Sequence, residues 1–271
     1  MIIRNFLFHR VSHVRDLLWD PISPEKFDAI IMLISKKFHV LNLENYLSSE
    51  STETFPKPLA TISFDDGYKD NIEFAADILT KYHCPASFYI TTGCIENNIP
   101  VWTYSIDYLF QNTANLTLEF NKDGIPENLK KTVWVNKKDR VEYAKKLKPY
   151  LKTINNCKRV SIISSIESSF NDVSSPLTMM NWKDINALVS SDFSIGSHTV
   201  SHPVLSSLED EVMLVKELKN SAKIIAEKTG KYPLSISYPF GCYNSQVIDY
   251  AKKSGYKLGL SVKQRIFNSL K

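Results

Sequence analysis

The chain is organised around the stretch TISFDDGY, residues 61–68. A short apolar run ends at Phe64 and is followed by two adjacent carboxylates, Asp65 and Asp66, and by Gly67. Neighbouring residues of a strand face opposite ways, so the carboxylates would diverge if the strand continued. The glycine permits a turn that brings both to the strand end, where one can bind a cation and the other can move protons. Taken alone, the stretch fits a polar turn before a helix better.

Composition indicates a folded protein and excludes several classes of function. The 271 residues are 43% apolar and 23% charged, which predicts a folded protein with a sizeable core. A chain of this length can form one large domain or two small ones, and we expect a single domain over residues 1–271. The net charge is only +4 and basic residues occur no more than two in a row, so nucleic acid is not an expected partner. The four cysteines are scattered, which argues against a thiolate zinc site. No signal peptide or transmembrane segment is recognisable, so we expect a cytoplasmic protein.

Strand and helix patterns alternate along most of the chain, which predicts parallel strands with right-handed crossovers. We expect strands at residues 6–8, 40–43, 59–64, 86–90, 193–196, 234–238 and 256–262. We expect helices to begin near residues 24, 44, 71, 182, 208 and 245. Residues 96–175 interrupt this rhythm and predict a mostly helical insertion that packs on the main domain. The aromatic stripe at its start, residues 102–110, is more typical of a core than of a ligand platform.

Three polar segments directly follow predicted strands: residues 65–66, the pair His198 and His202, and residues 239–241. In a parallel sheet they all lie at the carboxyl ends of the strands, so residues about 130 positions apart can meet. Two histidines and one carboxylate are ligands that zinc prefers, and three ligands leave a position for water. Alone, the histidines fit loop residues bonded to backbone equally well. The aspartate pair at the same edge favours a metal site.

These segments resemble the motifs of a known family, the polysaccharide deacetylases of the NodB-homology type, or carbohydrate esterase family 4. FDDG at 64–67 resembles their first motif, SHTVSHP at 197–203 their second and YPFG at 238–241 their third. The resemblance implies a distorted, incomplete (β/α) barrel. It also implies a metal-dependent hydrolase that removes N-acetyl groups from an amino sugar in a bacterial surface polysaccharide or its precursor, so the expected partner is an N-acetylated glycan.

The resemblance also implies roles for particular residues. Asp66, His198 and His202 would be the ligands of a divalent metal, with zinc expected and cobalt or nickel as alternatives. Asp65 would be the general base that takes a proton from water. The backbone N–H of Phe240 would help to hold the oxyanion of the tetrahedral intermediate.

Two departures from the family pattern concern how the catalytic groups are held and supplied. In the family, the third motif has an arginine two residues before its proline, and this arginine orients the base. The present chain has Ser237 at that position. The last motif, Leu-x-His with the general acid, is absent downstream of Phe240. Leu7-Phe8-His9 at the start of the chain matches it, as in circularly permuted relatives, so we expect His9 to be the general acid. A structural hydrogen bond at the strand end is the alternative for this histidine.

The sequence also fits two alternative functions. The missing arginine also fits a catalytically impaired member that binds carbohydrate, and the same machinery could hydrolyse another small amide such as a formamido sugar or a cyclic imide. Of the remaining histidines, we expect His39 and His83 to be structural, whereas His13 lies in a loop that could line the cleft.

Overall fold

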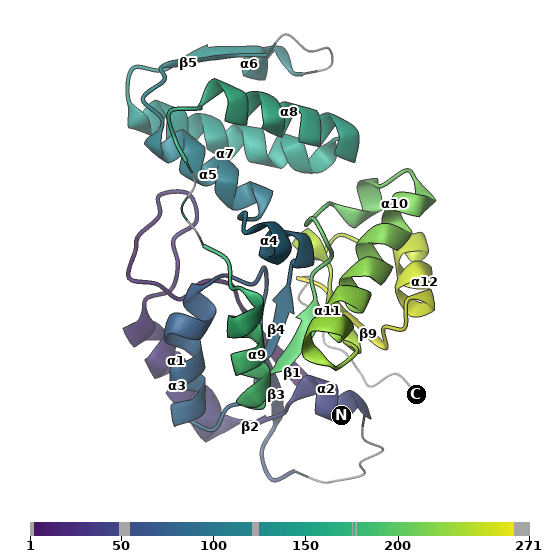
Figure 1. The fold of residues 1–271 in the computed structure, drawn as a ribbon. Helices are drawn as coiled ribbons and strands as arrows, with labels where there is room; N and C mark the ends of the chain where they lie inside the picture. Colours follow the sequence, from purple (N-terminus) through teal and green to yellow (C-terminus); the bar gives the residue numbers. More distant parts are fainter. Residues whose placement is uncertain (1–2, 49–54, 121–124, 175, 177, 263–271) are drawn as a thin grey trace.

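The computed structural model describes residues 3–48, 55–120, 125–174, 176 and 178–262. Within these residues one parallel sheet of seven strands forms the centre of the molecule. Its strands are β1 (Ile3–Phe8), β2 (His39–Val40), β3 (Leu59–Phe64), β4 (Ser87–Ile90), β7 (Ser194–Ser197), β8 (Ser235–Ser237) and β9 (Leu258–Leu260). Figure 1 shows the strands with helices packed around them, and the fold is the expected distorted, incomplete (β/α) barrel.

The order of the strands brings the three polar segments to one edge. The sheet runs β1-β3-β4-β7-β8-β9, and β2 pairs with the first residues of β3. β1 pairs with β3 along its whole length, so that Phe8 lies opposite Phe64 and the residues that follow them leave the sheet together. Because all pairs are parallel, the residues after β1, β3, β7 and β8 meet at the carboxyl end of the sheet, which we call the rim.

Helices follow most strands, as the sequence pattern predicts. Those of the main body are α1 (Pro24–Lys37), α2 (Leu43–Ser48), α3 (Ala76–Lys81), α4 (Thr92–Asn97), α9 (Trp182–Ser190), α10 (Glu211–Val215), α11 (Ser221–Thr229) and α12 (Ser245–Lys253). π-Helical turns precede α3 (Asn71–Ala75) and join α10 to α11 (Lys216–Asn220), and short 3₁₀ turns occupy Leu205–Ser207 and Pro239–Gly241. No helix in the described parts of the chain is long and apolar enough to cross a membrane.

Several expected boundaries differ from the structure, and two of them differ for a local reason. The strand expected over residues 40–43 ends at Val40, because Leu43 already begins α2. The helix expected from Leu208 begins at Glu211, because the side chain of Asp210 accepts a hydrogen bond from the backbone N–H of Val212 and caps it.

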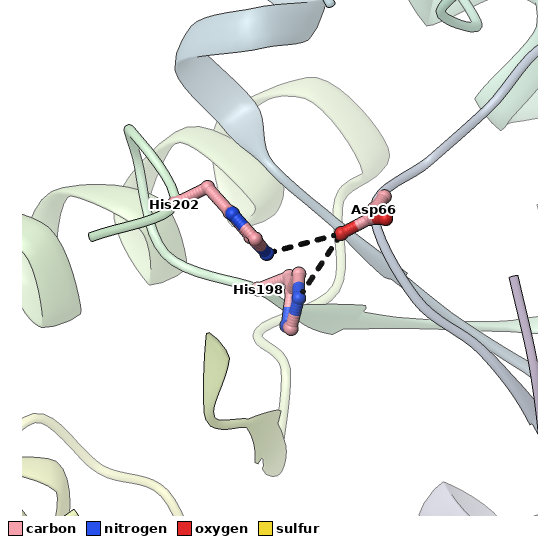
Figure 2. A group of neighbouring side chains, drawn as sticks. All are labelled: Asp66, His198 and His202. Carbon is pink, nitrogen blue, oxygen red and sulfur yellow. Dashed lines mark ion pairs between the residues drawn. The ribbon is translucent and has the colours of Figure 1, made fainter. Parts of the chain in front are cut away.

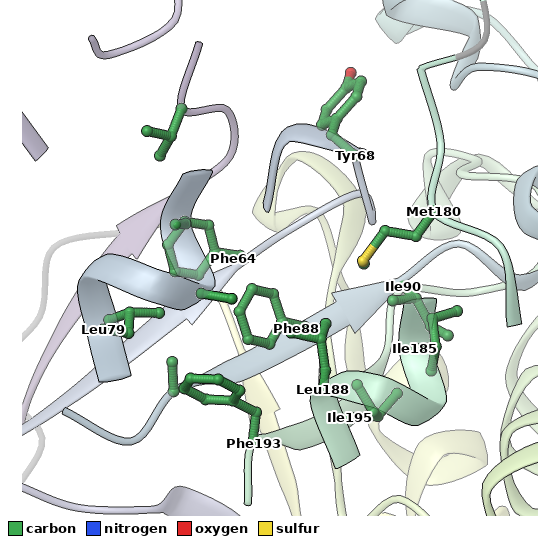
Figure 3. Close-up of a cluster of buried hydrophobic side chains, with 14 of the residues drawn as sticks. Phe64, Tyr68, Leu79, Phe88, Ile90, Met180, Ile185, Leu188, Phe193 and Ile195 are labelled. Atoms are coloured by element: carbon green, nitrogen blue, oxygen red, sulfur yellow. The ribbon is translucent and has the colours of Figure 1, made fainter. Parts of the chain in front are cut away.

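The main hydrophobic core fills the space between the sheet and α1, α3 and α9. All six residues of β3 are buried, and its two polar residues, Thr61 and Ser63, are satisfied because both hydroxyls donate to the side-chain oxygen of Asn5 on β1. The rings of Phe64 and Phe88 stack with centroids 4.9 Å apart, and Phe193 meets Phe88 edge to face (Figure 3). This packing fixes the ends of β3 and β4, from which the polar segments leave.

The insertion has a hydrophobic cluster of its own. Its elements are α5 (Trp102–Asn112), β5 (Thr117–Glu119), α6 (Glu127–Lys130), β6 (Lys131–Val133), α7 (Lys137–Thr153) and α8 (Asn156–Ser169), so it is mostly helical. Phe110, Trp134, Tyr143 and Phe170 pack against one another inside it. In Figure 1 these elements lie beyond α4, which begins at the carboxyl end of β4. The insertion therefore stands over the rim.

Candidate active site

The aspartate pair occupies a sharp turn at the end of β3. The backbone N–H of Asp65 donates to the carbonyl of Phe8 at 3.1 Å, which extends the β1–β3 pairing by one residue. The chain then reverses, with φ of 76° at Asp66 and 90° at Gly67. Both side chains are buried, with exposures of 2% for Asp65 and 3% for Asp66. The expected turn is present, but the aspartate itself shares the left-handed conformation with the glycine.

Left-handed backbone is concentrated at this site. Among the described residues, seven that are not glycine have positive φ. Four of these belong to the three polar segments, namely Asp66, Thr199, His202 and Phe240. Such conformations cost free energy and persist where surrounding structure holds them, which is typical of functional sites. The strain therefore marks the same rim that the motifs predict.

A buried glutamate holds the histidine loop in shape. Glu217 accepts hydrogen bonds from the backbone N–H groups of Val200 (2.8 Å) and Ser201 (2.9 Å) and from the Ser201 hydroxyl (2.6 Å). The Thr199 hydroxyl accepts from the N–H of His202 at 3.1 Å. Sequence reasoning missed Glu217, because its helical position gives no sign that it contacts a loop sixteen residues earlier.

Asp66, His198 and His202 converge, as the predicted metal site requires. The Nε2 atoms of His198 and His202 lie 3.3 and 3.2 Å from Asp66 Oδ1, and Figure 2 shows the three side chains pointing toward one another. All three are buried, and one potential ligand atom from each lies within 4.8 Å of the others. The predicted ligands therefore meet, although they come from two segments about 130 residues apart.

The hydrogen bonding of His198 fits a cation between these atoms. His198 Nδ1 donates to the carbonyl of Ser237 at 2.7 Å, so in the neutral ring Nε2 carries a lone pair. That lone pair faces the carboxylate oxygen of Asp66, which has no hydrogen-bond partner among the described residues. Two acceptors at this distance repel unless a proton or a metal ion lies between them. A borderline divalent cation suits this donor set of two imidazoles and one carboxylate.

The pKa shifts reflect the same concentration of charge. Burial opposes ionisation of Asp66, but the two histidines outweigh it and hold the pKa of this carboxyl well below its usual value. Burial also favours the neutral form of His198, yet Asp65 and Asp66 raise its pKa. For His202 burial prevails and lowers the pKa, which favours the neutral imidazole that metals bind.

Ser237 supports Asp65 in place of the absent arginine. Its hydroxyl donates to Asp65 Oδ2 at 2.9 Å, within the rim. Asp65 Oδ1 is buried and has no hydrogen-bond partner among the described residues, so one carboxylate oxygen is held and the other is available. Arg10 does not substitute for the arginine, because its Nε pairs with Asp70 Oδ2 at 2.8 Å.

His9 lies at the same rim as the aspartate pair. It follows Phe8, whose pairing with Phe64 places His9 beside Asp65 at the ends of adjacent strands. Its charge is among the influences that lower the pKa of Asp66. Its ring meets Trp19 edge to face with centroids 4.8 Å apart. His13 lies on the surface against Glu25 and Phe74.

The insertion supplies a second wall to the site, which we call the insertion wall and define as Trp102, Lys152 and Arg159. Trp102 Nε1 donates to the carbonyl of His202 at 3.0 Å. Phe240 lies between His202 and the insertion wall. Its ring centroid is 4.7 Å from that of His202 and 5.7 Å from that of Trp102. Lys152 Nζ stands 4.4 Å from the Phe240 centroid, and Arg159 Cζ 5.7 Å from that of Trp102. Sequence reasoning assigned Trp102 to a core and singled out neither cation.

Known proteins are similar to this chain in sequence. A sequence model of the polysaccharide deacetylase family matches residues 52–259. The poly-β-1,6-N-acetyl-D-glucosamine N-deacetylase of Staphylococcus aureus (strain N315) is 22% identical over 266 residues, which are 97% of this chain and 68% of that protein.

Solved structures agree in fold. The deacetylase PplD of Streptococcus pyogenes, solved with acetate, superposes with a TM-score of 0.63 at 17% identity over 98% of this chain and 86% of its own. A de-N-acetylase from Aggregatibacter actinomycetemcomitans gives 0.61 at 18% identity over 99% and 91%. IcaB from Ammonifex degensii gives 0.60 at 13% identity over 98% and 85%.

Proposed function

Because this chain belongs to the polysaccharide deacetylase family of the NodB type, we propose that it is a metal-dependent hydrolase that removes N-acetyl groups from an amino sugar in a bacterial surface polysaccharide or its precursor. The observation that carries the proposal is the convergence of Asp66, His198 and His202. The Nε2 lone pair of His198 is directed at a carboxylate oxygen of Asp66 that has no hydrogen-bond partner among the described residues. That arrangement suits a divalent metal, with zinc as the expected ion and cobalt or nickel as alternatives.

The side chains around this centre can divide the work of amide hydrolysis. A divalent ion held by the three ligands would polarise the acetamide carbonyl and lower the pKa of water. Asp65, held through Oδ2 by Ser237, has its Oδ1 free to take a proton from the attacking water. His9 gives a proton to the departing amine, which leaves poorly as an anion. The backbone N–H of Phe240 donates to the developing oxyanion.

Acetate release from a panel of N-acetylated glycans tests the proposal. Oligomers of β-1,6-linked N-acetylglucosamine are the first substrates to try, because the Staphylococcus aureus relative is named for that polymer. We expect acetate release that stops when a chelator removes the metal and returns when zinc is restored. Release that is indifferent to the chelator would count against a metal-dependent reaction.

A second candidate is a carbohydrate-binding member with little turnover. One observation favours it: Ser237 gives Asp65 a single neutral hydrogen bond where the family pattern has a charged arginine. Bound metal and glycan binding without release of acetate would support this alternative.

A formamido sugar is a further candidate substrate. Release of formate in place of acetate from matched sugars would support it.

A further inference from the structure

A cleft of about 190 Å³ lies between α8 and the histidine loop. We call it the α8 cleft. Its lining includes Trp102, Asn156, Arg159, Ser164, Glu167 and His202. At roughly 30 Å³ per water molecule in the liquid, this space exceeds what a single water fills and can hold a phosphate or a carboxylate group. It adjoins the proposed metal centre through His202, whose backbone carbonyl accepts the hydrogen bond from Trp102.

The guanidinium of Arg159 is a buried cation with an unsatisfied donor. The residue is only 1% exposed, and its Nη1 has no hydrogen-bond partner among the described residues. Its Nη2 donates to the side chain of Asn156, a neutral group. None of the ion pairs in the described chain includes Arg159. The Trp102 ring, whose centroid lies 5.7 Å from Cζ, offsets part of this charge. Burying a charge without an anionic partner is costly, so binding of a negatively charged group would be favourable here.

The nearest acidic influences do not supply that partner. Glu217 offsets part of the charge of Arg159, but its carboxylate oxygens already accept three hydrogen bonds from the histidine loop. Glu167 lines the same cleft, but it lies eight residues further along α8, about 12 Å away at 1.5 Å per residue. The Arg159 end of the cleft therefore remains positive.

The start of α8 adds to this positive field. The helix has 14 residues and begins at Asn156, which lines the cleft. Asn155 caps only part of the first turn, by accepting from the N–H of Lys158 at 2.9 Å. Helix N-termini favour anions, because their first N–H groups are unpaired and the helix dipole is positive there. The N-terminus of α8 and the guanidinium of Arg159 therefore each favour an anionic ligand.

We propose that the α8 cleft binds an anionic group, a phosphate or a carboxylate, carried by the glycan beside the sugar that loses its acetyl group, with Arg159 as the main contact. The glycan part of this inference rests on the proposed function, whereas the anion preference rests on the cleft itself. Arg159 lines the cleft and supplies the positive charge beside the anion, and Asn156, in the first turn of α8, lines it as well. The insertion thereby selects the substrate, and the rim performs the reaction.

Calorimetry on the metal-loaded protein tests the anion preference without requiring turnover. The probes are N-acetylglucosamine 1-phosphate, glucuronate and neutral N-acetylglucosamine. We expect one or both anionic sugars to bind at least tenfold more tightly than the neutral sugar, and the comparison of phosphate with carboxylate identifies the source. Arg159→Gln should reduce the affinity for the anionic sugar to that for the neutral one. Equal affinities in the unmodified protein would overturn the proposal, as would tight anion binding that survives Arg159→Gln, because that anion would sit on the metal.

Two further variants serve as controls, one for a general effect of charge and one for a failure of Arg159→Gln to fold. Lys146→Gln removes one positive charge from an exposed position of α7 outside the cleft, and we expect it to leave anion binding unchanged. Should Arg159→Gln not fold, Ser164→Glu places a negative charge in the cleft at an exposed position and should weaken anion binding at least fivefold. Anion affinity that Ser164→Glu leaves unchanged would contradict the assignment of the site.

The outcomes separate this inference from the proposed function. If anionic sugars bind through Arg159 but no glycan yields acetate, the cleft is supported and the deacetylase function fails. If acetate is released while Arg159→Gln alters neither binding nor the preference between neutral and anionic glycans, the function stands and the cleft fails.

Discussion

The rim and the insertion wall meet at one site but are built in different ways. At the rim, Asp65, Asp66, His198 and His202 are each at most 4% exposed and are held by strand register and hydrogen bonds. The insertion wall consists of an indole and two cations on helices outside the sheet. We infer that the rim carries the chemistry and the insertion the choice of substrate. Substitutions at the rim should therefore abolish turnover of every substrate, and those in the insertion should change which substrate is preferred.

The largest effect is expected from His198→Ala. This change removes a metal ligand and leaves Asp66 with one histidine near its Oδ1. Metal content should fall below one-tenth of the unmodified value, and acetate release should fall at least a thousandfold, as measured by elemental analysis and by an acetate assay. Full metal content with full activity would remove His198 from the ligand set.

Asp65→Asn should separate the two aspartates. The amide keeps the shape of the side chain but cannot accept a proton, so kcat should fall about a hundredfold to ten-thousandfold while metal content stays near that of the unmodified protein. Parallel metal analysis is the control. Loss of the metal would show that Asp65 is a ligand, and undiminished kcat would show that it is not the base.

His9→Ala should lower kcat for N-acetylated glycans about a hundredfold if His9 protonates the leaving amine. Hydrolysis of 4-nitrophenyl acetate, whose leaving group needs no proton, should fall less than threefold. Equal losses on both substrates would instead indicate a structural role, consistent with the contact between His9 and Trp19.

Ser237→Ala removes the hydroxyl that donates to Asp65 Oδ2. The loss of such a hydrogen bond costs about 1–3 kcal/mol when the partner stays buried, so kcat should fall roughly tenfold. Ser235→Ala is the matched control on the same strand, because the hydroxyl of Ser235 contacts Tyr89 and Glu44 and not Asp65. Identical kinetics for the two variants would show that Ser237 does not orient the base.

The smallest effect is expected from Lys152→Gln in the insertion wall. The ammonium stands 4.4 Å from the Phe240 centroid, a cation–π contact worth about 0.5–2 kcal/mol. We expect KM to change threefold to tenfold with little change in kcat, whereas Lys146→Gln should change neither. A loss confined to kcat would place Lys152 in the chemical step and weaken the division between the two regions.

The rim could be predicted from sequence because its determinants are local. Asp65 and Asp66 directly follow one buried strand and His198 directly follows another, so these side chains lie at one edge once the strands are parallel. Left-handed backbone at Asp66 is compatible with aspartate, so the turn also follows from the residues themselves. The hydrogen bond that supports Asp65 comes from Ser237, which occupies the position where the family pattern has its arginine.

The insertion wall could not be predicted in the same way. Trp102 belongs to an aromatic stripe that reads as core, and its contact with His202 appears only when α5 docks on the histidine loop. Arg159 resembles any surface cation in the sequence, yet it is buried by the packing of α8. Such contacts depend on how two separately packed regions meet, and hydrophobic periodicity carries no signal for that.

The most direct test of the account is acetate release from an N-acetylated glycan during a metal titration of the chelator-treated protein. We predict no release without metal, full release near one equivalent of zinc, and no release at any zinc concentration from His198→Ala. Release that persists without metal, or its absence from every glycan tested with one zinc bound, would contradict the assignment of Asp66, His198 and His202 as the centre of a deacetylase.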